Sequence, residues 1–578
     1  MSFDESIPIG GLGNKRKISA HCTGDGWFFH TENQKFGPFS LGLTNGQVDK
    51  RDLETISSKL AVSGDILPQL ISEEICKEIT LVELAGILAT TVKCDEAAKI
   101  VTFLNMLLAQ TDEDQFNIAF QGLSSGGKSY IPLEIVAYFP DGERREYSHA
   151  SPQSLYHEAT EWQPIQEVAK KLDLTGIFDK TELGPESKII VHVLDLERKI
   201  VIFVDQPNSQ LMARLRSFLS HDRKILRVGI TDKSHGGNLR TKIIVVKGFA
   251  SVFFSSANPY LDAQEKTRAW VFFPDPRSDK VNEALSVLTR KISDRKAFRD
   301  WLSSHPLRNL LQERVRLIRQ EGIRNVIIPN PEKVLEQFKS GRRIQARLLR
   351  DYPRFLCLVK AIALLNCFHR RRRDAETIEA DAKDVDAALW LYEKFALQNE
   401  LGLSAESWYV YQLLLVMPDA KTIGVGRGDV LAMFLHEYGT PLSMDNLRRL
   451  ILPELESAGL IEQRENPEDH REVLVVLSLV ASPIFNIDQR PGENNDPVEQ
   501  KKIAEAIEWL KNPANQLTPG TRSLKRFTDT FGPRVVELMK QRNLILTMRT
   551  DTGGVIFFTG KDSVSKSLAK DDTIPNGT

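Results

Sequence analysis

Apolar residues recur at helical spacing in the first part of the chain. From about Leu67 to Gln110 they fall three and four positions apart, which predicts helices that each bury one face. Residues 115–275 instead read as short apolar strands that alternate with helical segments, a pattern typical of an α/β core. We therefore expect a helical collar over residues 66–112 and an α/β domain over residues 113–280.

The same pattern divides the rest of the chain into smaller pieces. The segment 1–65 is rich in glycine with short aromatic groups, which indicates a small accessory region or a poorly ordered arm. Residues 281–400 are helical in pattern, carry many basic residues, and are expected to form a helical lid. The polar, Pro- and Asn-rich stretch 481–497 is predicted to be a linker, and the tail 563–578 is predicted to be disordered.

Two C-terminal regions carry the parts of winged-helix domains, namely helices followed by a β-hairpin. In residues 402–480 the helices are expected at Trp408–Val416, Arg427–Tyr438 and Ser443–Ala458, before two strand-like runs around the sequence PEDH. In residues 498–562 they are expected at Gln500–Leu510, Leu524–Phe531 and Pro533–Arg542, with a hairpin turn at Asp551–Gly554. Winged helices bind DNA about as often as protein, so the pattern leaves both partners open.

Composition limits the class of protein. Of 578 residues, 41% are hydrophobic and 26% charged, as in ordinary globular proteins, and the length implies several domains. The net charge of -1 gives no global signature for nucleic acid, so any DNA-binding surface must be local. We see neither a membrane-spanning run nor a signal-peptide pattern, and therefore expect no membrane. The five cysteines lack CxxC spacing, which argues against a zinc site or disulfide framework and fits a cytoplasmic location.

The strongest chemical signal is the segment FNIAFQGLSSGGKSYIPLEIVAYF. A strand-like run is followed by a complete G-x-x-x-x-G-K-S phosphate-loop pattern and then by a helix. Glycines let backbone N–H groups surround phosphate, Lys128 can neutralise the β- and γ-phosphates, and the Ser129 hydroxyl can ligate Mg²⁺. We predict a site for ATP and Mg²⁺ whose cradle is formed by Gly122, Leu123, Ser124, Ser125, Gly126, Gly127, Lys128, Ser129 and Tyr130.

A second element is expected to supply the metal-side carboxylate. The run Ile200–Val204 reads as a buried strand and ends in Asp205, our candidate for holding Mg²⁺ directly or through water. Gln206 follows, where many such ATPases carry a glutamate that activates the attacking water. Glutamine can position water but cannot accept its proton. Three explanations stay open: slow hydrolysis, a base elsewhere, or replacement of a natural glutamate.

The order of these motifs resembles that of AAA+ ATPases of the pre-sensor-1 hairpin branch, in particular the MCM-like helicases of bacterial mobile elements. The resemblance covers about residues 65–480. The segment GFASVFFSSANPYLD resembles the sensor-1 strand, which implies that Asn258 contacts the γ-phosphate or its attacking water. The segment KTRAWVFFPDP resembles the one with the arginine finger, which implies that Arg268 completes a neighbouring subunit's site. A long helical segment resembles the lid with its sensor-2 arginine, Arg354 or, in a shifted register, Arg350.

One further segment, RVGITDKSHGGNLRTKIIVVKG, resembles the pre-sensor-1 hairpin, which in that family grips single-stranded DNA in a central pore. Two β-like runs, Arg227–Thr231 and Thr241–Lys247, flank a Gly-rich turn with basic side chains, which suit a phosphate backbone. The expected DNA contacts are Lys233, His235, Arg240 and Lys242. The run Arg370–Arg373, by contrast, is expected to be a solvated helix end.

The resemblance implies an ATP-driven DNA helicase or translocase that forms a ring, expected to be a hexamer, in the replication of a mobile element. Each ATP site would combine the loop and Asp205 of one protomer with Arg268 of the next. Two other functions stay open. One is a DNA-binding initiator or loader that does not unwind DNA, and the other is a signalling or defence ATPase whose winged helices bind protein.

Overall fold

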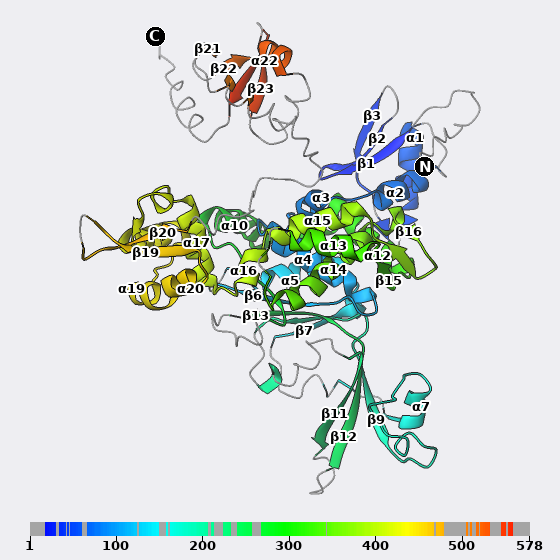
Figure 1. Cartoon of the computed structure of the whole chain (residues 1–578). Helices are drawn as coiled ribbons and strands as arrows, with labels where there is room; N and C mark the ends of the chain where they lie inside the picture. The colour runs from blue at the N-terminus through cyan, green and yellow to red at the C-terminus, as the bar shows by residue number, and fades with distance from the viewer. Residues whose placement is uncertain are drawn as a thin grey trace. The chain divides into compact units, whose positions relative to one another are not determined.

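The computed structural model (Figure 1) divides into two units, Met1–Ile487 and Asp488–Thr578. In the first unit it describes residues 18–30, 34–41, 43–44, 47–60, 66–123, 126–148, 156, 158–159, 162–205, 210–212, 223–232, 240–256, 267–340, 342, 344–467 and 470–478. In the second it describes residues 505–506, 509–510, 516–518, 521–531, 545–550 and 553–558. Among the helices in these ranges, none combines the length and the apolar character needed to cross a membrane.

A five-stranded parallel sheet forms the centre of the first unit, in the order β14-β6-β13-β10-β7. The strands are β6 Asn117–Gln121, β7 Arg144–Tyr147, β10 Ile200–Phe203, β13 Ser251–Ser256 and β14 Trp270–Phe272. Every residue of β6, β10, β13 and β14 is buried, as in parallel sheets covered on both faces. The prediction of an α/β fold is confirmed at this level.

Helices from before and after the sheet in sequence share one hydrophobic core with it. They are α2 Ile66–Cys76, α3 Leu81–Leu88, α4 Glu96–Leu107, α5 Tyr130–Ile135, α12 Pro306–Gln320, α13 Pro331–Lys339, α14 Leu348–Leu365 and α15 Ala382–Glu393. Helix α4 is buried at every position from Ala98 to Leu107, because other elements cover it on all sides. The helices expected over residues 66–112 are therefore present, and they share this core with the sheet.

The region after the central sheet contains strands as well as helices. Its other helices are α10 Ser278–Ser293, α11 Arg295–Ser303 and α16 Ala396–Glu400, and its strands are β15 Asn325–Ile327, β16 Arg371–Arg372 and β17 Thr377–Glu379. The expectation of solvated side chains at Arg370–Arg373 is confirmed for Arg371, Arg372 and Arg373, which are exposed, and is wrong for Arg370. Arg370 is buried and donates to both carboxylate oxygens of Asp384 at 2.7 and 2.8 Å, since a buried guanidinium needs an anionic partner.

The N-terminal segment is a small antiparallel sheet rather than a poorly ordered arm over the described part of residues 18–60. Its elements are β1 Ser19–Thr23, β2 Gly26–His30, β3 Lys35–Phe39, β4 Leu43–Thr44, β5 Gln47–Val48 and α1 Lys50–Leu60. Strands β1, β2 and β3 pair in that order, and Trp27 and Phe29 of β2 are buried. Its aromatic residues thus form a core.

A second sheet of four strands, in the order β11-β12-β9-β8, contains the predicted hairpin. Its elements are β8 Trp162–Pro164, α7 Ile165–Ala169, β9 Ile190–Asp195, β11 Ile225–Asp232 and β12 Arg240–Lys247. Figure 1 shows β11, β12 and β9 side by side, with β11 antiparallel to β12 and β9 parallel to it. The hairpin prediction is confirmed, whereas its pairing with β9 was not anticipated.

Three helical segments and a three-stranded antiparallel sheet complete the first unit. They are α17 Ala405–Val416, α18 Arg427–Tyr438, α19 Met444–Asn446, a π-helical turn Leu447–Ile451, α20 Leu452–Ser457, β18 Val425–Gly426, β19 Ile461–Glu465 and β20 Val473–Leu477. The expected helices and hairpin are confirmed. The third helix is irregular before Pro453, which cannot donate a backbone hydrogen bond.

The second unit contains a four-stranded antiparallel sheet in the order β21-β22-β24-β23. Its elements are β21 Gln516–Thr518, β22 Thr521–Ser523, α22 Leu524–Phe531, β23 Ile545–Thr550 and β24 Gly553–Phe558. Helix α22 has the predicted bounds, and Thr550 pairs with Gly553 where the hairpin turn was expected. The helix predicted at Pro533–Arg542 lies outside the described residues.

Candidate functional site at the carboxyl edge of the central sheet

The ends of three parallel strands bring the predicted nucleotide residues to one edge of the sheet. Ser256 at the end of β13 pairs with Gln121 at the end of β6. Phe203 of β10 pairs with Phe254 of β13, so Asp205, two residues later, stands level with Ser256. Because β13 lies between β6 and β10, Asp205 is two strand spacings, roughly 10 Å, from the end of β6. Ligands of open α/β sheets bind at such carboxyl edges.

The loop after β6 has a backbone that requires glycine at two positions. Gly122 and Gly127 have φ values of +143° and +91°, which residues with side chains rarely adopt. Space is limiting as well, because a Cβ atom on Gly122 would lie 2.5 Å from the Tyr409 hydroxyl oxygen. Helix α5 begins at Tyr130, with Ser129 at its N-cap position. The loop therefore leads into a helix N-terminus, where backbone N–H groups favour an anion.

The ammonium of Lys128 lies inside this loop. Its Nζ donates to the carbonyl oxygen of Leu123 at 2.6 Å and to that of Gly122 at 3.1 Å. Burial lowers the pKa of Lys128 below its usual value. A cation in this position is suited to the oxygens of a phosphate chain that the loop would surround.

A second ammonium group, that of Lys280, also donates a hydrogen bond to the loop, and no sequence motif indicates this residue. Nζ of Lys280, in the first turn of α10, donates to the carbonyl oxygen of Gly126 at 3.1 Å and pairs with Asp95. The carboxylate of Asp95 is almost fully buried and also accepts from the backbone N–H of Asp275 at 2.7 Å. Burial raises the pKa of Asp95, although Lys280 opposes the shift. These residues are far apart in sequence, so no motif connects them.

Tyr409 links the loop to residues 405–477. It belongs to α17 and faces Gly122, and its hydroxyl donates to the carbonyl oxygen of Pro274 at 2.8 Å. Both Tyr409 and Pro274 are thus neighbours of the loop at Gly122. The first helix of residues 405–477 therefore packs directly on the candidate site, which the sequence did not indicate.

The residues at this edge fit a magnesium ion. The donors are the Ser129 hydroxyl at the start of α5 and the exposed Asp205 carboxylate after β10. Mg²⁺ prefers oxygen ligands and is usually held by one or two protein groups, with phosphates and water completing its shell. Across the described ranges, no three His, Cys, Asp or Glu side chains gather as a protein cage for a metal.

Several predicted site residues lie outside the described residues: Ser124, Ser125, Gln206, Lys233, His235 and Asn258. Asn258 is two positions beyond Ser256, the last residue of β13. Gln206 directly follows Asp205.

Arg268 lies at the opposite, amino edge of the sheet. The side chain of Asn117, the first residue of β6, donates to the backbone oxygen of Arg268 at 3.0 Å. Strand β6 runs from there to Gln121, a distance of roughly 13 Å. The backbone of the half-buried Arg268 therefore lies beside the start of β6, at the end of this strand away from the candidate loop of the same chain.

Both sensor-2 candidates also lie near this amino edge. Nη2 of Arg354 donates to the backbone oxygen of Thr267 at 2.8 Å, and Nη1 to the buried Asp351 at 3.2 Å. Arg350 is exposed and donates to the Thr267 hydroxyl. Arg354 is thus engaged within its own chain beside Arg268, whereas Arg350 is the more accessible of the two.

Two of the residues that are expected to contact DNA, Arg240 and Lys242, belong to strand β12 of the second sheet. Arg240 is the first residue of β12 and pairs with Asp232 of β11. Lys242 is half-buried, and its Nζ donates to the carbonyl oxygen of Ala159 at 3.3 Å. Lys242 therefore has a partner in its own chain, which reduces its availability to a DNA phosphate.

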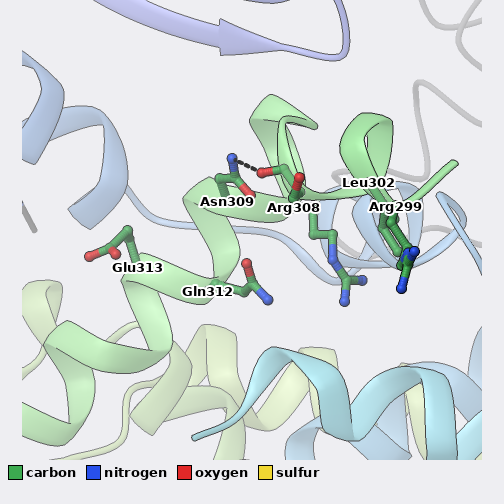
Figure 2. Close-up of a pocket in the computed structure, with 7 residues that line it drawn as sticks. Arg299, Leu302, Arg308, Asn309, Gln312 and Glu313 are labelled. Atoms are coloured by element: carbon green, nitrogen blue, oxygen red, sulfur yellow. Dashed lines mark hydrogen bonds between the residues drawn. The ribbon is translucent and has the colours of Figure 1, made fainter. Parts of the chain in front are cut away.

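A cavity of about 350 Å³ lies between α11 and α12 (Figure 2). Its lining residues are Arg299, Leu302, Ser303, Arg308, Asn309, Gln312 and Glu313. None of them belongs to the strand ends that carry the nucleotide residues. This cavity is therefore distinct from the predicted ATP site.

No protein-family model matches the chain, and no curated protein matches it either.

Proposed function

We propose that this chain is a P-loop ATPase that binds Mg-ATP between residues 122–129 and Asp205. The proposal rests on one observation, the convergence of the glycine-dependent loop, the N-terminus of α5, Lys128 and Asp205 at the carboxyl edge of one parallel sheet. The loop N–H groups and Lys128 would hold the phosphates. Ser129 and Asp205 would hold the magnesium ion, which neutralises developing charge on the phosphates.

Hydrolysis is proposed to take place in an assembly of several copies, expected to be a hexameric ring. The position of Arg268 supports this idea, since it starts at the amino edge, roughly 13 Å from the loop end of β6. A guanidinium there is poorly placed for its own site but can serve the site of a neighbour. An arginine finger of this kind stabilises charge in the transition state.

The assembly is proposed to act on single-stranded DNA as an AAA+, MCM-like helicase or translocase. The hairpin of β11 and β12 supports this proposal, because each strand has 8 residues, Lys233 and His235 lie in the sequence between the strands, and Arg240 begins β12. Residues 405–477 combine helices with a three-stranded antiparallel sheet, which supports the proposal of a winged helix there. The second unit resembles that arrangement in its helix α22 and hairpin.

The steady-state ATPase rate, with and without single-stranded DNA, tests this function in the chain and in Gln206→Glu. We expect DNA to stimulate turnover and Gln206→Glu to raise the rate at least about tenfold, because glutamate can accept a proton from water. If single-stranded DNA changes the ATPase rate of neither protein, the proposal of a DNA motor is contradicted. A strand-displacement assay then separates a helicase from an initiator or loader.

A further inference from the structure

Helix α10 (Ser278–Ser293) carries an apolar stripe that faces solvent. Four large side chains lie on one helical face and are exposed as follows: Val281 47%, Leu285 51%, Leu288 47% and Ile292 59%. None of the 16 residues of the helix is buried. Helices in proteins gain most of their stability by packing an apolar face, and exposed apolar patches mark interaction sites. A partner that covers this stripe is therefore expected.

The stripe lies beside the proposed ATP site. Lys280 in the first turn of α10 donates to the loop oxygen of Gly126 at 3.1 Å. Lys291 in the last turn pairs with Glu134 of α5 at 3.1 Å. Helix α10 therefore lies beside α5, the helix that follows the loop, and its lysine side chains make the contacts. A molecule that covers the stripe would also stand next to the loop.

The opposite edge of the same chain offers a complementary surface. Ile344 and Leu349 are 66% and 80% exposed, and Leu349 is adjacent in sequence to Arg350, which contacts the residue before Arg268. Exposed apolar side chains thus occur on both surfaces, on a helix that contacts the loop in one case and next to Arg350, which contacts the residue before Arg268, in the other.

We propose that the α10 stripe is the contact surface for a second copy of this chain, which presents the edge of Ile344, Leu349 and Arg350. The inference rests on the proposed function, because Arg268 can serve a phosphate loop only if another copy's amino edge approaches it. Two different surfaces make a heterologous contact, which builds rings when its rotation closes. The same contact brings Arg268 of one copy toward the loop of the next.

A charge-reversal test uses the full chain. Leu285→Glu with Leu288→Glu places two carboxylates in the stripe, and Asn282→Glu with Ser286→Glu adds the same charge to another face of α10 as the matched control. Sedimentation velocity with Mg²⁺ and a slowly hydrolysed ATP analogue measures assembly. The stripe variant should need at least about tenfold more protein to assemble, whereas the control should assemble as the unmodified chain does. All four positions are exposed, so each variant should still fold.

A titration of each variant with the same analogue separates this inference from the proposed ATP site. Weak assembly with unchanged nucleotide affinity in the stripe variant would support the inference. Assembly equal to that of the control, or an unmodified chain that stays monomeric with nucleotide, would overturn it. Loss of analogue binding by the unmodified chain would instead overturn the ATP site alone.

A crosslink tests which surface of the second copy is involved. With a short bismaleimide, a mixture of Ile292→Cys and Leu349→Cys chains should yield a covalent dimer beyond the amount that either variant forms alone. Equal yields in the mixture and in the single variants, under conditions where the chains assemble, would overturn the pairing of these two surfaces.

Discussion

Lys280 and Asp95 form a buried ion pair, and the same ammonium of Lys280 donates to the carbonyl oxygen of Gly126 in the candidate loop. Asp95 comes from the turn before α4 and Lys280 from α10, so the pair connects two elements separated by the whole central sheet in sequence. Loss of the ammonium would leave a buried carboxylate without its counter-ion, which is strongly destabilising. We therefore expect replacement of Lys280 to lower the free energy of unfolding by an amount that depends on pH.

Lys280→Met should weaken ATP binding by about tenfold, because the loop loses a charge-assisted hydrogen bond. It should also lose stability as pH rises. Burial already raises the pKa of Asp95, and removal of Lys280 should raise it further. Above about pH 4, the unfolded carboxyl ionises while the folded one keeps its proton, so the free energy of unfolding falls.

Chemical denaturation from pH 4 to pH 8 measures this effect against the unmodified chain. Lys280→Arg should restore most of the affinity. Lys280→Met with Asp95→Asn should remove the added pH dependence. A stability difference between Lys280→Met and the unmodified chain that stays constant with pH would contradict the role given to the pair.

The hairpin makes a prediction about DNA binding. Lys233→Ala with Arg240→Ala should weaken binding of single-stranded DNA without lowering ATP affinity. If both side chains contact phosphates, the slope of log affinity against log salt should become shallower by roughly 1.4. Lys242→Ala is the matched control, because its ammonium already bonds to Ala159, and it should change the slope less. Equal slopes for all three proteins would show that the hairpin does not hold the strand.

The sequence predicted the elements of the site better than its surroundings. The loop pattern and the strand before Asp205 each have a local signature, and the structure has a strand at both places. The sheet order, which separates β6 from β10 by β13, depends on long-range pairing that no local pattern encodes. The contacts of Lys280 and Tyr409 with the loop are equally long-range.

Basic residues were the hardest to interpret from sequence. Arg370 begins a run of four arginines, a pattern that predicts an exposed side chain. It is instead buried and donates two hydrogen bonds to the carboxylate of Asp384. Arg354, the sensor-2 candidate, donates to Asp351 and Thr267, contacts that no local sequence pattern indicates. The partners of a charged side chain can come from elements that are distant in sequence. The exposure of the side chain therefore depends on the fold and cannot be predicted from a local pattern.

Arg268 should act in trans. In a chain with Gln206→Glu, Arg268→Ala should bind ATP nearly normally yet hydrolyse it about 10³-fold more slowly or worse. Mixing this protein with Lys128→Ala in the same background should restore some turnover, because mixed rings contain interfaces with one intact loop and one intact arginine. If mixed rings form and no ratio restores turnover, Arg268 serves its own chain.

The central claim is that residues 122–129 bind the phosphates of Mg-ATP, and a calorimetric titration of the chain and of Lys128→Ala tests it most directly. Lys128 donates to two carbonyls of the loop, so its replacement removes the cation from the centre of the proposed site. We predict that the unmodified chain binds Mg-ATP and that Lys128→Ala, still folded by circular dichroism, does not. Equal affinity in the two proteins would contradict the account.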